Sequence, residues 1–214
     1  MKRRYKNSDS AIYTDHLQEF YTRAKTPHLE VYGDAYQALR SAIVGLAEPT
    51  AQDVIVDLAT GGGYQAAEFQ KSGYCAYGFD YVYDRALLSQ EQHMPKCLHW
   101  GVADISQLPF SSKSIDIVTV SLALHDLPAD VLTRALREIN RVTRKRVILL
   151  EPQAPCNYIL QRLYVAIAEI VDESTHIAEF LAHDFEAMLN NARLEIQHRQ
   201  KCLYNVLTMY SCVP

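Results

Sequence analysis

Short apolar runs alternate along this chain with longer segments in which apolar residues recur every three or four positions. Runs rich in β-branched, leucine and aromatic residues predict buried strands, and the periodic segments predict helices packed along one face. Five runs predict the strands of a central sheet: Val54–Val56, Tyr74–Phe79, Cys97–Val102, Ser114–Leu122 and Val147–Glu151. Because helical segments separate most of these strands, the pattern predicts an α/β fold with a doubly wound, mostly parallel sheet and helices on both faces.

Helical periodicity also precedes the first strand. The segments 10–25 and 34–47 each place apolar residues at helical spacing, and we expect them to form an N-terminal helical cap over residues 1–50. The sheet domain itself is then expected to cover residues 51–214.

The chain beyond the fifth strand combines helical periodicity with two further strand patterns. Residues 157–173 and 183–192 predict a helical insertion at about 155–192. The runs Leu194–His198 and Asn205–Tyr210 predict two further strands.

The first strand ends in a carboxylate followed by a glycine-rich turn. The segment Asp57–Gly63 reads DLATGGG and leads directly into a helical pattern that begins at Tyr64. Glycine has no Cβ and tolerates positive φ, so such a loop lets the backbone approach a ligand closely. The loop alone fits a dinucleotide site, a site for S-adenosylmethionine (SAM) or an unliganded turn. Asp57 favours SAM, because a carboxylate repels a pyrophosphate and attracts a sulfonium and an ammonium.

Two more acidic residues follow later strands. Asp80 ends the second predicted strand, where a carboxylate can accept hydrogen bonds from a ribose diol. Asp104 follows the third strand in the segment Ala103–Phe110, where a carboxylate and an aliphatic side chain can hold a purine. Helix capping for Asp80 and an ordinary acidic loop for Asp104 are the alternatives.

Bulk properties narrow the class of protein. The 214 residues are 49% hydrophobic, which fits one globular domain with a full core. A formal charge of -4 and a pI near 6.0 argue against a general nucleic-acid binder. Five cysteines without a C-x-x-C pair indicate neither a disulfide framework nor a zinc cluster. With neither a signal peptide nor an apolar span in the pattern, we expect a cytoplasmic protein.

Several segments in one order resemble the class I SAM-dependent methyltransferases, and within them the small-molecule type that includes the ubiquinone/menaquinone biosynthesis enzymes. These segments are VIVDLATGGG, YGFD, VADISQLPF, SIDIVTVSLALHDL and ALREINRVTRKRVILLEP. The resemblance implies a Rossmann-like fold with SAM as the cofactor, and the last two predicted strands look like the antiparallel pair that closes the seven-stranded sheet in this family. It also implies cofactor contacts from Asp57, Ala59, Gly61 and Gly63 at the methionine part, Asp80 and Tyr81 at the ribose, Asp104 and Ile105 at the adenine, and Ser121 and Leu122 at the floor of the site.

The chain departs from the family pattern at two places. Ala59 stands where the family usually has its first glycine, which adds a methyl group where the loop turns. The family often has Lys-Pro-Gly-Gly before the fifth strand, whereas this chain has Thr143–Arg146, which we expect to form the turn after a helix over 128–142.

The expected chemistry is direct in-line methyl transfer to a small molecule without a metal. A sulfonium makes its methyl group electrophilic, so the protein has mainly to align the acceptor and exclude water. His125, at the end of the fourth strand, is the candidate general base, with a pocket-wall or structural role as the alternatives. His176 and His183 flank a segment that can lie over the pocket, or they lie on the surface.

Two other functions stay open. An RNA or protein methyltransferase would use the basic cluster Arg141, Arg144, Lys145 and Arg146. A non-catalytic SAM-binding protein would share the cofactor motifs without methyl transfer. The sequence leaves the identity of the acceptor and the oligomeric state open.

Overall fold

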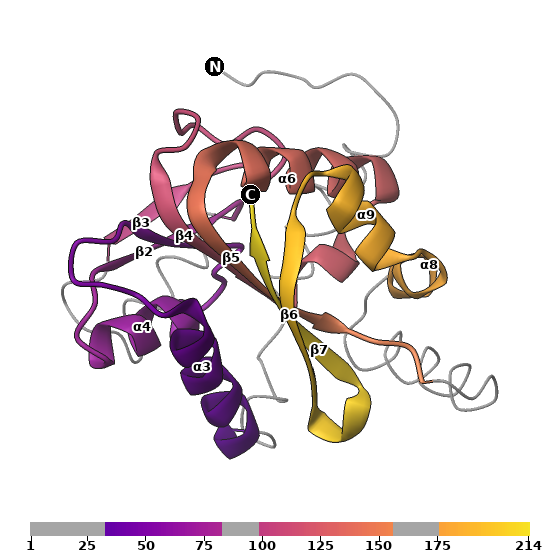
Figure 1. The fold of residues 1–214 in the computed structure, drawn as a ribbon, viewed down its shortest axis with the longest axis horizontal. Coiled ribbons are helices and arrows are strands. Elements are labelled where there is room, and N and C mark those ends of the chain that lie inside the picture. The colour runs from indigo at the N-terminus through magenta and orange to yellow at the C-terminus, as the bar shows by residue number, and fades with distance from the viewer. Residues whose placement is uncertain (1–32, 83–98, 156–175) are drawn as a thin grey trace.

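The computed structural model describes residues 33–82, 99–155 and 176–214, and a seven-stranded sheet lies at its centre (Figure 1). The order of the strands across the sheet is β3-β2-β1-β4-β5-β7-β6. The strands are β1 (Ile55–Leu58), β2 (Ala76–Asp80), β3 (His99–Val102), β4 (Ile115–Ser121), β5 (Thr143–Pro152), β6 (Glu195–Cys202) and β7 (Leu207–Val213).

The first five strands run parallel to one another, and the last two reverse the direction. β1 pairs in parallel with β2 and β4, β2 with β3, and β4 with β5. β7 is antiparallel to both β5 and β6. The predicted fold class, including the antiparallel C-terminal pair, is therefore confirmed.

Helices cover both faces of the sheet (Figure 1). Apolar side chains of α3 and α4 form one buried cluster with β1, β5 and β7, and those of α6, α8 and α9 form a second cluster with the opposite face. The described helices are α3 (Gly33–Ala47), α4 (Tyr64–Lys71), α6 (Ala129–Val142), α8 (Ile177–Ala182) and α9 (Phe185–Asn191), with 3-10 turns η1 (Leu124–Asp126) and η2 (Leu203–Asn205). Because both faces are covered, β4 is buried along almost its whole length, as its continuous apolar run predicts.

The helix predicted over 34–47 is confirmed as α3, which packs through Ile43 against the sheet side that carries Ile148. The predicted helices over 10–25 and 157–173 lie outside the described residues. The proposed domain boundaries, 1–50 and 51–214 with an insertion at about 155–192, stay predictions.

The predicted turn over Thr143–Arg146 is wrong, because β5 begins at Thr143 directly after α6 ends at Val142. The Thr143 hydroxyl donates to the carbonyl of Ile139 (2.6 Å), so the chain leaves the helix without a glycine. Arg144 then pairs with Asp116 of β4, at a register shift between these two strands. Ion pairs thus hold the charged start of β5 in the sheet. A hydrophobicity pattern predicts a turn there, because the segment is polar.

Candidate cofactor and acceptor site

The glycine loop turns from β1 into α4 through three residues with left-handed backbones. Ala59, Gly61 and Gly63 have φ values of 52, 51 and 70°. Gly63 donates its N–H to the carbonyl of Thr60 (2.7 Å) and immediately precedes α4. Glycine adopts this region freely, but Ala59 adopts it at a cost of about 1–2 kcal/mol. Ala59, which replaces the family's usual glycine, therefore stands at a position where the backbone conformation favours glycine.

Asp57 lies beneath this loop with its carboxylate buried. Its two oxygens accept hydrogen bonds from the hydroxyls of Thr60 (2.5 Å) and Thr119 (2.6 Å). Thr119 is the register partner of Asp57 on β4, so the pairing of the strands brings the two side chains together. Burial raises the pKa of Asp57 to about 6, and nearby Asp80 adds to this shift while the two hydroxyls oppose it. A cation bound nearby would therefore stabilise the ionised form of Asp57.

Asp80 ties the other side of the loop to the end of β2. Its Oδ2 accepts from the backbone N–H of Gly61 (2.8 Å), and its Oδ1 accepts from that of Val82 (3.0 Å). The N–H of Thr60 also donates to the carbonyl of Phe79 (3.1 Å). The predicted residues Asp57, Gly61 and Asp80 are thus brought together at the carboxyl ends of neighbouring strands, whereas Tyr81 is 44% exposed beside them.

Arg40 of α3 brings a positive charge to the same region, which the sequence analysis did not foresee. Its guanidinium lies over the ring of Tyr64, the first residue of α4, at 4.8 Å from the ring centroid. Burial lowers the pKa of Arg40, and nearby acidic groups that include Glu68 and Asp57 offset part of this effect. Nothing in the sequence pattern places α3 beside the glycine loop, since that contact depends on tertiary packing.

Asp104 and Ile105 begin a tight turn after β3. The Oδ1 atom of Asp104 accepts from the N–H (2.8 Å) and the hydroxyl (2.7 Å) of Ser106, and its carbonyl accepts from the N–H of Gln107 (2.9 Å). Ile105 packs against the apolar cluster on the α6 face of the sheet. The N–H of Ala103 donates to the carbonyl of Asp80 (3.0 Å), which places the turn next to the end of β2.

The chain leaves β4 through Ser121 and Leu122. Leu122 has a φ of 54°, and its N–H donates to the carbonyl of Leu150 on β5 (2.8 Å). A left-handed leucine is a strained position of the kind that gathers at ligand sites. The hydroxyl of Ser121 is buried and has no hydrogen-bond partner within the described part of the chain. The end of β4 therefore has a hydroxyl that is available to a ligand, at Ser121, and a strained backbone, at Leu122.

Glu151 at the end of β5 organises the turn that follows. This fully buried carboxylate accepts backbone N–H groups from Ala123 (3.1 Å) and Leu124 (2.9 Å). Its Oε2 lies 2.8 Å from Nδ1 of His125. A carboxylate oxygen accepts hydrogen bonds, so the contact suits a proton on Nδ1 of the imidazole. Nε2 lies 3.6 Å from Oδ1 of Asp126, an oxygen without a hydrogen-bond partner among the described residues.

The sequence analysis placed Glu151 only as the last residue of the fifth strand and missed this role. The signal was present, because an acidic residue is the last but one of β5, much as Asp80 is the last of β2. Its partner could not be foreseen, since the contact requires η1 to fold back over the end of the neighbouring strand.

Aromatic rings from the C-terminal part of the chain lie beside His125. The ring of Phe180 on α8 lies 6.2 Å from that of His125 in an edge-to-face arrangement, and Phe185 lies 5.0 Å from Phe180. Phe185 in turn contacts Tyr210 of β7 at 5.7 Å. An apolar aromatic wall therefore extends from the imidazole into the core.

The two other candidate histidines lie at the surface. His176 and His183 flank α8, and each faces Glu179 of that helix, at 3.6 and 3.9 Å. Their side chains are 27 and 45% exposed. Of the three candidates, only His125 lies at the carboxyl end of a central strand.

The basic cluster lies at the end of β5 opposite to Glu151, and its charges are already paired. Lys145 contacts both Asp53 (2.5 Å) and Asp116 (3.1 Å), and Arg144 contacts Asp116 (2.7 Å). The two remaining pairs are Arg141 with Glu138 and Arg146 with Glu48. Each cation of the cluster is therefore paired with at least one carboxylate, which lowers the net positive charge of this surface.

Comparison with known proteins decides between the cofactor classes. Residues 56–150 match the family described as "Methyltransferase domain". This part of the chain is similar to class I SAM-dependent methyltransferase domains, as the sequence motifs predict. The predicted cofactor, SAM, is thereby confirmed for the domain, and the dinucleotide alternative falls away.

Relatives and solved structures agree with the domain assignment. The demethylmenaquinone methyltransferase of Mycobacterium sp. (strain JLS) is 30% identical over 114 residues, which are 52% of this chain and 47% of that protein. The chain thus spans about half the length of the curated relatives it matches. The magnesium protoporphyrin IX methyltransferase of Synechocystis PCC 6803 with bound S-adenosylhomocysteine (SAH) shares the fold, with a TM-score of 0.68, 16% identity, and coverage of 96% of this chain and 99% of that one.

A third similarity also supports the fold. A complex of the Haloferax volcanii Trm112 methyltransferase activator with a methyltransferase matches with a TM-score of 0.71 at 13% identity, covering 92% of this chain and 96% of that one.

Among the described residues, no helix has the length and apolar character needed to cross a membrane. The same described residues hold no group of three or more His, Cys, Asp or Glu arranged for a metal.

Proposed function

We propose that this protein transfers the methyl group of SAM to a small-molecule acceptor by direct in-line displacement. The observation that carries the proposal is the pair of buried carboxylates, Asp57 and Asp80, bound to the two sides of one glycine loop in a methyltransferase domain. Bound SAM would supply an electrophilic methyl group. The protein then has to hold the cofactor, orient the acceptor and exclude water.

The residues at the loop fit the charges of the cofactor. Asp57 offers a negative charge to the ammonium and sulfonium, and Arg40 offers a bidentate donor to the methionine carboxylate. Asp80 has the geometry for a ribose diol, and Asp104 with Ile105 has the chemistry for adenine. Buried carboxylates at the turn suit this cation better than a pyrophosphate, which supports SAM over a dinucleotide.

His125 is the group we propose as the general base. The contact with Glu151 holds Nδ1 in its protonated form, so Nε2 is the atom that accepts a proton from the acceptor. The adjacent Phe180 adds an apolar surface, which favours an aromatic or otherwise apolar acceptor with an acidic O–H, N–H or C–H group. Relatives named demethylmenaquinone methyltransferases support a small acceptor of this character.

A methyl-transfer assay with labelled SAM tests the proposal. We expect label to move to at least one apolar phenol, quinol or heteroaromatic compound in a broad panel, and to move poorly to RNA or protein substrates. No transfer across the panel, with cofactor binding retained, would support a non-catalytic SAM-binding protein. Transfer to RNA that weakens steeply as the salt concentration rises would support the nucleic-acid alternative. We do not expect this result, because the cations of the basic cluster are paired with carboxylates.

A further inference from the structure

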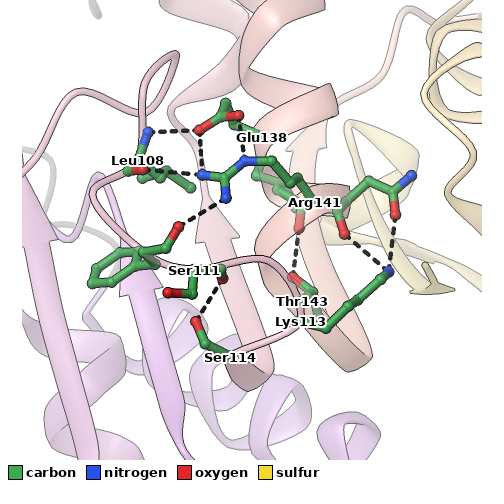
Figure 2. Close-up of polar contacts among 10 residues, drawn as sticks. Leu108, Ser111, Lys113, Ser114, Glu138, Arg141 and Thr143 are labelled. Atoms are coloured by element: carbon green, nitrogen blue, oxygen red, sulfur yellow. Dashed lines mark hydrogen bonds and ion pairs between the residues drawn. The ribbon is translucent and has the colours of Figure 1, made fainter.

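We infer that the Glu138–Arg141 pair of α6 is a positioning unit for the adenine subsite of the proposed cofactor site. Figure 2 shows these side chains reaching from α6 to the backbone of the segment that follows Asp104 and Ile105. The inference rests on the proposed function, because it assigns the pair a role in holding SAM. Nothing in the pair itself touches the reacting atoms, so its action is through the segment that it holds.

The pair binds both the donor and the acceptor of one peptide segment. Oε2 of Glu138 accepts the N–H of Leu108 (2.8 Å), and Nη2 of Arg141 donates to the carbonyl of the same residue (3.0 Å). Nη1 of Arg141 donates to the carbonyl of Phe110 (2.8 Å). Three backbone groups on either side of Pro109 are therefore fixed by two side chains of a neighbouring helix.

The two side chains also fix each other. Nε and Nη2 of Arg141 donate to Oε1 (2.7 Å) and Oε2 (2.8 Å) of Glu138, a bidentate arrangement. This contact lowers the pKa of Glu138 and raises that of Arg141, so both groups stay charged across the ordinary pH range. A planar guanidinium that is held in this way presents its remaining donors in a fixed direction, which a lysine ammonium does not reproduce.

The segment between β3 and β4 is thereby held at both ends. At its start, the Asp104 turn is closed by Ser106, and Ala103 donates to the carbonyl of Asp80. At its end, the pair holds Leu108 and Phe110. The stretch from Asp104 to Phe110, which carries the predicted adenine contacts, is therefore held on both sides, and a fixed stretch loses less conformational entropy when the cofactor binds.

An aromatic contact connects the same segment to the ribose side of the site. The ring of Phe110 meets that of Phe79 edge to face, with centroids 4.9 Å apart. Phe79 directly precedes Asp80 on β2. By holding the carbonyl of Phe110, Arg141 also keeps this ring against the strand that carries the predicted ribose carboxylate.

A second ion pair on α6 provides a matched control. Arg134 and Asp130 are joined at 2.7 Å on the same helix, but their side chains are 45 and 65% exposed, and they lie about one to three turns away from the pair that holds the segment. Arg134→Ala breaks this ion pair and changes the charge of α6 by one unit, as Glu138→Gln does in the opposite sense. It leaves the contacts to Leu108 and Phe110 in place.

The test compares Arg141→Lys and Glu138→Gln with Arg134→Ala in the full-length protein. Calorimetry measures the Kd for SAH and for S-inosylhomocysteine, in which a carbonyl replaces the adenine amine. We expect both pair variants to bind SAH about tenfold more weakly and to lose most of the preference for adenine over hypoxanthine. We expect Arg134→Ala to keep the wild-type affinity and preference.

The outcomes separate the inference from the proposed function. If the wild type binds SAH but both pair variants keep its affinity and base preference within twofold, the positioning role is overturned, even where their melting temperatures fall. If the wild type itself binds no SAH, the proposed function fails and the inference fails with it. Should Arg141→Lys not fold, Glu138→Gln decides, because it keeps the shape and the Leu108 acceptor while it loses the charge.

Discussion

Nδ1 of His125 lies 2.8 Å from Oε2 of Glu151, a carboxylate that is completely buried at the end of β5. The same carboxylate accepts the backbone N–H groups of Ala123 and Leu124, so the imidazole and its turn share one anchor. Glu151 thus holds the position of His125 and, in the proposed tautomer, accepts the Nδ1 proton. The two residues form a unit like the base and orienting acid of other proton-transfer sites.

The first prediction concerns this unit. Replacing His125 by Gln removes the proposed base, and we expect kcat for an ionisable acceptor to fall about 100-fold. The Kd for SAH, measured by calorimetry, should stay within twofold of the wild type, because His125 lies outside the glycine loop. An unchanged kcat would leave His125 as a wall of the pocket and not a base.

Glu151→Gln tests the orienting half of the unit. The amide keeps the shape of the side chain but loses the charge that stabilises a protonated imidazole, so we expect kcat to fall about tenfold and the pH dependence of kcat to shift. A fall in stability with an unchanged pH profile would show that Glu151 only holds the η1 turn.

Asp57 predicts a pH dependence of both stability and cofactor affinity. Its pKa of about 6 in the folded protein is raised by burial above the ordinary value of about 3.9. Its contribution to the free energy of unfolding is therefore complete below pH ~3.9 and is lost as the pH rises through about 6. Ionised Asp57 attracts the ligand ammonium, so we expect SAH affinity to increase about three- to tenfold between pH 5 and 7.

The matched variant for this prediction is Asp57→Asn. The amide does not ionise, so the increase in SAH affinity between pH 5 and 7 should disappear in calorimetric titrations. A slope that persists in Asp57→Asn would assign the titration to another group.

Ala59 predicts a stabilising substitution. Its φ of 52° lies where glycine is favoured, so Ala59→Gly should raise the free energy of unfolding by up to about 1 kcal/mol in chemical denaturation. The control is Ala66→Gly, in the buried middle of α4, which should lower it by about 1 kcal/mol. A loss of stability in both variants would contradict the strain assigned to Ala59.

Because the ion pairs at the start of β5 lie far from the proposed cofactor site, we expect their loss to lower stability without changing cofactor binding. Asp116→Asn weakens the contacts with Arg144 and Lys145 but keeps an acceptor for the N–H of Val54, so we expect a loss of about 1–2 kcal/mol in the free energy of unfolding. SAH affinity should not change, because these contacts lie at the opposite end of the sheet. Unchanged stability together with weaker SAH binding in this variant would contradict the structural role.

Sequence patterns predict the central sheet well, because its strands are buried on both faces and read as apolar runs such as β4. They also place Asp57 and Asp80 at the carboxyl ends of two predicted strands, which are parallel neighbours in the sheet. They fail at Thr143–Arg146, where Asp116 of β4 and Asp53, just before β1, hold a charged segment in the sheet. They also leave Glu151 and Arg40 unassigned, because tertiary contacts alone define those roles.

A calorimetric titration of the purified protein with SAH, with Asp80→Ala alongside, tests the cofactor assignment most directly. We expect one site per chain with a Kd in the micromolar range, and at least tenfold weaker binding in Asp80→Ala because the ribose and Gly61 both lose their carboxylate partner. Absence of SAH and SAM binding at millimolar ligand would contradict the proposed function.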